Sequence, residues 1–144
     1  MTSINAVLAA KGRAVATIAV DAPLAAAAAE LASRRIGALV VLGRDGAVAG
    51  ILSERDLVRG LADHGPDVLG RSIESLMTSD VVTVAPDLPV FSALGLITKR
   101  RIRHLPVMKG ESLVGIVSIG DLVKHRMEQI EAEAAAMRSY IQGA

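Results

Sequence analysis

Two Ser-x-x-Asp segments, Ser53 to Asp56 and Ser118 to Asp121, each place a hydroxyl and a carboxylate three residues apart. Each segment follows an apolar run and precedes a helix-forming stretch, so the serine is expected at the start of a helix. In one interpretation the pair is only a capping box, in which both side chains bond backbone N–H groups. In the other, the carboxylate also accepts hydrogen bonds from the hydroxyls of a ligand, and the N–H groups of the helix start meet an anionic oxygen.

The two segments belong to an internal duplication. With an offset of 66, residues 15–42 align with residues 81–108, and 11 of the 28 pairs are identical. After a one-residue deletion in a turn-rich stretch, where a change of length costs little, residues 50–58 align with residues 115–123. The two halves therefore share one fold.

Each half predicts the element order β-α-β-β-α. A short strand around Thr17 or Thr83 leads into Asp-x-Pro, and a helix over residues 24–35 or 90–101 follows. Two apolar runs form a hairpin, at 38–42 and 48–52 in the first half, and the second helix of that half is expected to end near Gly60. We expect a mixed helix and sheet (α+β, α/β) fold in which two repeats pack face to face about a pseudo-twofold axis. Ligand clefts would lie between the repeats.

We divide the chain into an N-terminal segment with the first repeat (1–63), a linker (64–76), the second repeat (77–128) and a C-terminal helical tail (129–144). Apolar residues recur along the tail at alternating spacings of three and four: Met127, Ile130, Ala134, Met137 and Ile141. This heptad stripe fits a homodimer contact, which we favour, or a helix folded back on its own domain.

The segments Gly50–Leu57 and Gly115–Leu122, the second preceded by Arg101–Val107, resemble the signature of CBS domains. Over about residues 4–128 the chain is similar to stand-alone proteins made of one CBS pair, which assemble as disc-shaped dimers called Bateman modules. The resemblance implies a regulatory ligand, AMP, ADP or ATP first, with S-adenosylmethionine or NAD(H) as alternatives.

The same resemblance assigns roles to individual residues. It implies that Asp56 and Asp121 bind the ribose hydroxyls and that Ser53 and Ser118 stand beside them, near ribose or phosphate oxygens. It also implies that the edge of the adenine is bound, chiefly through backbone groups, by Thr17, Ile18, Thr83, Val84 and Pro106. For the two threonines the simpler alternative is the preference of threonine for strands.

Cations near these segments could hold the phosphates. Arginine and a protonatable imidazole neutralise phosphate oxygens, and the resemblance places Arg103 and His104 near them. The alternatives are an exposed surface charge for Arg103 and a hydrogen-bonded sheet residue for His104. Arg55 offers a further contact in the first repeat, but Gly120 stands at its place in the second. We therefore expect two unequal sites, in which loss of Asp121 weakens ligand binding more than loss of Asp56.

Composition argues against several other classes of function. The net charge is +1, and one Phe, one Tyr and no Trp leave few rings for stacking on bases, so nucleic acid is not expected. No apolar stretch is long enough to cross a membrane, and the absence of cysteine suits the reducing cytoplasm. With three dispersed histidines, of which His64 and His125 are expected to be ordinary surface residues, no metal site is predicted.

No nucleophile with a base, and no phosphate-binding glycine motif, can be found, so we expect no catalysis and no catalytic cofactor. The leading hypothesis is a sensor that binds an adenine nucleotide and modulates a partner enzyme or transporter. The alternative is a ligand-independent scaffold for dimerisation.

Overall fold

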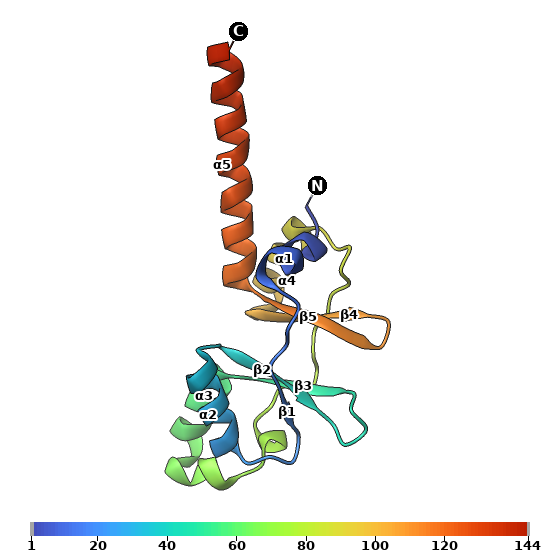
Figure 1. The fold of residues 1–144 in the computed structure, drawn as a ribbon. Helices are drawn as coiled ribbons and strands as arrows, with labels where there is room; N and C mark the ends of the chain where they lie inside the picture. Colours follow the sequence, from blue (N-terminus) through green and yellow to red (C-terminus); the bar gives the residue numbers. More distant parts are fainter. Residues whose placement is uncertain (1, 144) are drawn as a thin grey trace. The chain divides into compact units, whose positions relative to one another are not determined.

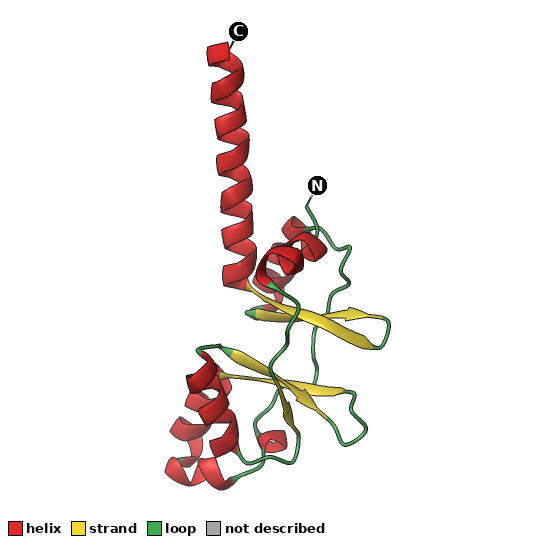
Figure 2. Cartoon of the chain, viewed as in Figure 1, coloured by secondary structure: helices red, strands yellow, loops and turns green. Residues whose placement is uncertain are grey.

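The computed structural model of the chain describes residues 2–143. Its elements are, in order, α1 (Ile4–Lys11), β1 (Thr17–Ala19), α2 (Leu24–Arg34), β2 (Ala38–Leu42), β3 (Val48–Ser53), α3 (Glu54–His64), η1 (Pro66–Gly70), η2 (Ile73–Ser75), α4 (Val90–Arg100), β4 (His104–Lys109), β5 (Ser112–Ser118) and α5 (Ile119–Gly143). The mixed helix and sheet fold and the C-terminal helix are confirmed (Figure 2). By its contacts the chain forms two compact units. The face-to-face packing of the repeats stays a prediction.

The unit around the first repeat comprises residues 14–82 and 110–113. Its sheet has the order β1-β2-β3, with β1 parallel and β3 antiparallel to β2 (Figure 1). The central strand β2 is buried over its first four residues, which explains its continuous apolar run. Helix α2 buries residues three and four apart, Leu24, Ala27 and Leu31, in the same core.

The unit around the second repeat comprises residues 2–13, 83–109 and 114–143 of the described chain. Its sheet consists of β4 and β5 alone. The prediction of a strand around Thr83 is wrong, because this segment pairs with β4 only through a single parallel bridge between Val84 and Val107. The two repeats therefore differ at the first strand.

Two prolines explain the missing strand. In the first repeat, Val40 N donates to Ala16 O at 3.1 Å and Val20 N donates to Leu42 O at 2.9 Å, which extends the pairing of β1 with β2. At the offset of 66 the two donors correspond to Pro106 and Pro86. Proline has no N–H, so both bonds are lost and only the central bridge survives.

Helix α3 runs past Gly60, where the sequence predicted its end, and stops at Gly65, which has a φ of 73°. A Cβ on Gly60 would lie only 2.5 Å from Cδ1 of Leu76 and 3.3 Å from Cγ2 of Val68. This glycine therefore allows the helix to pack closely against the chain that follows it, and does not terminate the helix.

Each unit is completed by the segment that precedes the other repeat. Helix α1 lies before the first repeat but packs in the unit of the second, where Ile4 N donates to Leu88 O at 2.9 Å. The segment between the repeats packs in the unit of the first, where Ile73 N donates to Ala22 O at 3.1 Å. Leu88 and Ala22 are equivalent at the offset of 66, so Ile4 and Ile73, both fully buried, occupy equivalent places.

The predicted linker is thus part of a core. Residues 64–76 contain the two short 3₁₀ helices, and Val68 and Ile73 are wholly buried with the first repeat. The sequence places the end of the linker at residue 76, whereas the compact unit around the first repeat continues to residue 82.

Helix α5 is continuous over 25 residues. Its first turns pack on α1 and α4, with Leu122 fully buried, whereas every described residue from 131 onward is exposed. Figure 1 shows this part extending from its own unit with no other element beside it. The alternative of a tail folded back on its domain is not seen. Within residues 2–143 no helix is long and apolar enough to cross a membrane.

Candidate functional site

In the first repeat, Ser53 and Asp56 form a reciprocal cap where β3 meets α3. Asp56 N donates to Ser53 Oγ at 3.3 Å, and Ser53 N donates to Asp56 Oδ2 at 2.8 Å. Ser53 Oγ also donates to the same carboxylate oxygen at 3.1 Å. The predicted capping box is present, and it occupies one of the two oxygens of the carboxylate.

The second repeat repeats this geometry where β5 meets α5. Ser118 N donates to Asp121 Oδ2 at 2.8 Å, and Asp121 N donates to Ser118 Oγ at 3.1 Å. In both repeats Oδ1 has no hydrogen bond among the residues that the structure describes. Capping and ligand binding are therefore compatible, because a carboxylate offers about four lone-pair positions and the cap uses only those of one oxygen.

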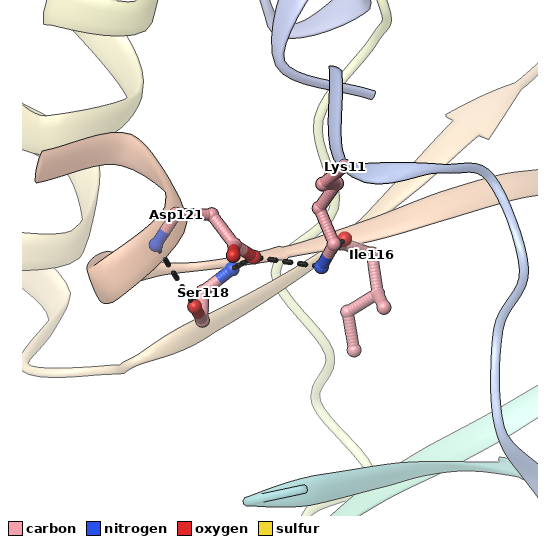
Figure 3. Close-up of polar contacts among 4 residues, drawn as sticks. All are labelled: Lys11, Ile116, Ser118 and Asp121. Atoms are coloured by element: carbon pink, nitrogen blue, oxygen red, sulfur yellow. Dashed lines mark hydrogen bonds and ion pairs between the residues drawn. The ribbon is translucent and has the colours of Figure 1, made fainter. Parts of the chain in front are cut away.

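A residue outside both repeats joins the second site. Lys11 Nζ, at the end of α1, donates to Asp121 Oδ2 at 2.7 Å and to the backbone oxygen of Ile116 at 2.9 Å (Figure 3). The side chains of Lys11 and Asp121 are 32% and 26% exposed, so the ion pair is partly shielded from water. The carboxylate of Asp121 is thus neutralised within its own unit.

These contacts set the protonation of Asp121. Partial burial raises the pKa of its carboxyl, but the hydrogen bonds from Lys11 and from Ser118, with the positive charge of Lys11, outweigh burial. The pKa of Asp121 is therefore lowered from its ordinary value, and the group is ionised at neutral pH.

The first repeat has no equivalent lysine. Ile4 and Ile73 make equivalent hydrogen bonds, so the segment before the first repeat aligns with the segment before the second at an offset of 69. At this offset Asp80 corresponds to Lys11. Among the described residues Asp56 has no ion-pair partner. One site therefore holds a carboxylate without a cation, and the other holds an ion pair.

The proposed phosphate residues lie on different elements. Arg103 is exposed, and its backbone oxygen accepts from Ile119 N at 2.8 Å, which puts it beside the first turn of α5. His104 begins β4 and is half-buried. Arg55 is exposed on α3 and lines a shallow hollow together with Glu54, Val58, Arg59 and Ala62. Their contact with phosphate stays a prediction.

The proposed adenine residues follow the first segment of each repeat. Thr17 and Ile18 lie on β1, in register with Val40 and Val41 of β2, and Thr17 is exposed. In the second repeat Val84 N donates to Pro106 O at 3.1 Å.

The bonds of Val84 limit what its segment can offer to a base. Its backbone oxygen also accepts from Met108 N, at 2.9 Å, so both of its backbone groups are bonded to β4. Backbone contact with a base would therefore come from neighbouring residues such as the exposed Thr83.

Sequence reasoning missed Lys11, and it misjudged His125. Lys11 lies before the aligned repeats and 110 residues from Asp121, so no local pattern marks it. His125 is half-buried on α5, and its Nε2 is buried with no hydrogen-bond partner, so the expectation of an ordinary surface residue is wrong. No group of three His, Cys, Asp or Glu within residues 2–143 could hold a metal ion.

Comparison with known proteins matches the CBS domain to residues 12–63 and 73–128. The chain is 37% identical over 117 residues to "CBS domain-containing protein CBSX3, mitochondrial" of Arabidopsis thaliana, covering 78% of this chain and 57% of that protein. It covers 31% and 60% of the related proteins of Thermofilum pendens and Acidianus ambivalens. The chain thus spans about a third to two thirds of the length of these curated relatives.

Solved structures agree over most of the chain. The CBS-domain containing protein ATU1752 from Agrobacterium tumefaciens has a TM-score of 0.84 and 40% identity, covering 87% of this chain and 93% of that one. The CBS domain pair of protein MJ0100, solved in complex with 5′-methylthioadenosine and S-adenosyl-L-methionine, has a TM-score of 0.78 and 25% identity, covering 90% and 98%.

Proposed function

Because the chain belongs to the CBS-domain family and carries two CBS domains, we propose that it is a regulatory module that binds an adenosyl ligand, AMP, ADP or ATP first. The bound ligand would change the activity of a partner enzyme or transporter. CBS pair proteins are regulatory modules, and stand-alone ones are generally non-catalytic. The proposed ligand, partner and cytoplasmic location go beyond these relatives.

The observation that carries the proposal is the uncommitted carboxylate oxygen at each helix start. Oδ1 of Asp56 and of Asp121 remains available while Oδ2 holds the cap. The cap also fixes the direction of the side chain, so binding a diol would order little that is not already ordered. Bonds from ribose hydroxyls to such a carboxylate are charge-assisted and stronger than neutral ones.

The ligands of a related protein support the class of molecule. MJ0100 was solved with two compounds that share adenine and ribose and differ in the group on the 5′ carbon. Recognition of the shared part fits an acceptor for the ribose diol. In this chain Arg55, Arg103 and His104 would favour phosphates on the 5′ side.

The two sites should bind unequally. At Asp56 a ribose meets a carboxylate that has no ion-pair partner within residues 2–143. At Asp121 the ribose must share the carboxylate with Lys11, which already bonds Oδ2. The cations Arg103 and His104 favour phosphate at the second site. Because Lys11 already bonds Asp121, we now expect the stronger ribose contact at Asp56, the reverse of the order expected from the sequence.

Calorimetric titration tests the proposal. AMP, ATP, S-adenosylmethionine, 5′-methylthioadenosine and NADH are titrated into the wild-type chain and into Asp56→Asn and Asp121→Asn. Asp63→Asn, an exposed residue of α3 without a recorded partner, is the matched control.

We expect micromolar binding of at least one ligand, a loss of about 1 to 3 kcal/mol in Asp56→Asn, a smaller loss in Asp121→Asn and none in the control. Affinity no better than millimolar for all five ligands would instead support the ligand-independent scaffold. Strong binding that neither site variant weakens would overturn the ribose role alone.

A further inference from the structure

The second half of α5 carries apolar side chains with nothing to cover them. Met137 is 61% and Ile141 67% exposed, and Met127 and Ile130, nearer the unit, are 57% and 48% exposed. Residues 131–143 of α5 are all exposed, and a helical segment this short is only marginally stable in water when it packs against nothing. The exposed stripe therefore marks a surface that another helix would stabilise.

The stripe is distinct from the face that α5 uses inside its own unit. Leu122 is buried there, and His125, Arg126 and Gln129 are half-buried on the same face. The apolar stripe, at positions 127, 130, 134, 137 and 141, is displaced by about a third of a turn from that face. A second helix can lie along it without displacing α1 or α4.

The charges beside the stripe identify the second helix. With Met127 at position a of the heptad, Arg126 and Glu133 occupy g, and Glu131 and Arg138 occupy e. None of the four has an ion-pair partner among the described residues. In a parallel, in-register pair of helices, each g residue faces the e residue five positions later in the other helix.

We propose that α5 pairs with α5 of a second copy of the chain, in parallel and in register, over Met127–Ile141. In this arrangement Arg126 faces Glu131 of the other copy and Glu133 faces Arg138, so every pair joins opposite charges. Twofold symmetry gives each pair twice.

The antiparallel alternative brings like charges together. When two antiparallel helices overlap along the whole stripe, e faces e and g faces g, so Glu131 meets its own copy and Glu133 meets its own copy. Lys124 then meets Arg138. The charges therefore favour the parallel orientation over the antiparallel one. This inference does not depend on the proposed ligand.

Engineered cysteines test the orientation, because the chain has no cysteine of its own. Met137→Cys sits on the stripe at position d, and Ser139→Cys sits two residues away at the outward position f. In the parallel pair the two sulfurs introduced by Met137→Cys meet, whereas in the antiparallel pair position 137 lies opposite position 127. We expect mild oxidation to link most of the Met137→Cys chains and few of the Ser139→Cys chains, on non-reducing gels and by mass spectrometry. Equal linking of both variants, or none in Met137→Cys, overturns the proposal.

Charge reversal gives an independent readout on exposed residues that leave the fold intact. By sedimentation equilibrium at low salt, Glu133→Arg alone and Arg138→Glu alone should each weaken the dimer about 10-fold, since each turns two attractive pairs into repulsive ones. The double variant E133R/R138E should restore it. In the antiparallel pair Glu133→Arg would change nothing and Arg138→Glu would strengthen the dimer, so either result overturns the parallel arrangement.

Discussion

Replacing Lys11 by methionine removes one charge and keeps most of the apolar stem. The lysine donates two hydrogen bonds, at 2.7 Å to Asp121 Oδ2 and at 2.9 Å to Ile116 O. A hydrogen bond to a charged group contributes about 1.5–3 kcal/mol, whereas an exposed ion pair contributes about 0–1 kcal/mol. The two side chains are 32% and 26% exposed, so we expect Lys11→Met to lower the free energy of unfolding by about 1–2 kcal/mol at pH 7.

The loss must depend on the charge of Asp121. The pKa of this carboxyl is lowered in the folded chain, so its ionised form stabilises the fold above its unfolded pKa of about 3.9. That stabilisation disappears as the pH falls through the lower folded value. The difference between wild type and Lys11→Met should therefore stay constant from pH 7 to about pH 5 and shrink below about pH 4.

Urea unfolding of a double-mutant cycle isolates the pair. Wild type, Lys11→Met, Asp121→Asn and the double variant are compared at pH 7 and at about pH 3, and the interaction energy is the non-additive part. Lys109→Met, an exposed lysine on β4, controls for loss of a charge without a partner. Additive effects at pH 7 would refute the ion pair, and a difference that persists unchanged at pH 3 would refute its dependence on the carboxylate.

Three further substitutions test the packing and the cap by thermal and urea unfolding. Gly50→Ala should destabilise the chain by about 1–3 kcal/mol, because its Cβ would lie 2.7 Å from the backbone oxygen of Thr78. The control Gly70→Ala, whose Cβ would have nothing within 4 Å, should have no such effect, and equal destabilisation by both would contradict the close packing at Gly50. His125→Leu should raise the free energy of unfolding by about 1 kcal/mol, because it removes a buried nitrogen that has no hydrogen-bond partner. A lower free energy of unfolding would show that the imidazole makes a favourable contact. Ser53→Ala should cost about 1 kcal/mol through loss of the cap, whereas an unchanged midpoint would mean that water replaces it.

Features encoded within a few residues could be predicted from the sequence. The hairpin strand β2 has the predicted bounds Ala38–Leu42, because its apolar run is bounded by turn residues. Both Ser-x-x-Asp caps form as expected, since a serine and a carboxylate three residues apart meet within one helical turn. The duplication itself predicted two copies of one domain, and the CBS domains found in both halves confirm it, although the second copy lacks the first strand of the predicted element order.

Features that depend on a distant partner could not be predicted in this way. Gly60 resembles a helix end in sequence, but its role is set by Leu76, which packs against it after the chain has turned back. The missing strand at Thr83 had its cause in the sequence, in Pro86 and Pro106, but it became evident only when the equivalent bonds of the first repeat were known.

The difference between the two sites likewise separates what local sequence encodes from what depends on a distant residue. The sequence by itself determined that each repeat carries a capped carboxylate at a helix start, because those contacts are local. Only the tertiary structure decided that one carboxylate is paired with a cation, because Lys11 reaches Asp121 across 110 residues through the packing of α1 beside α5. The packing of buried side chains such as Ile4, rather than any pattern near Lys11, holds that lysine in place.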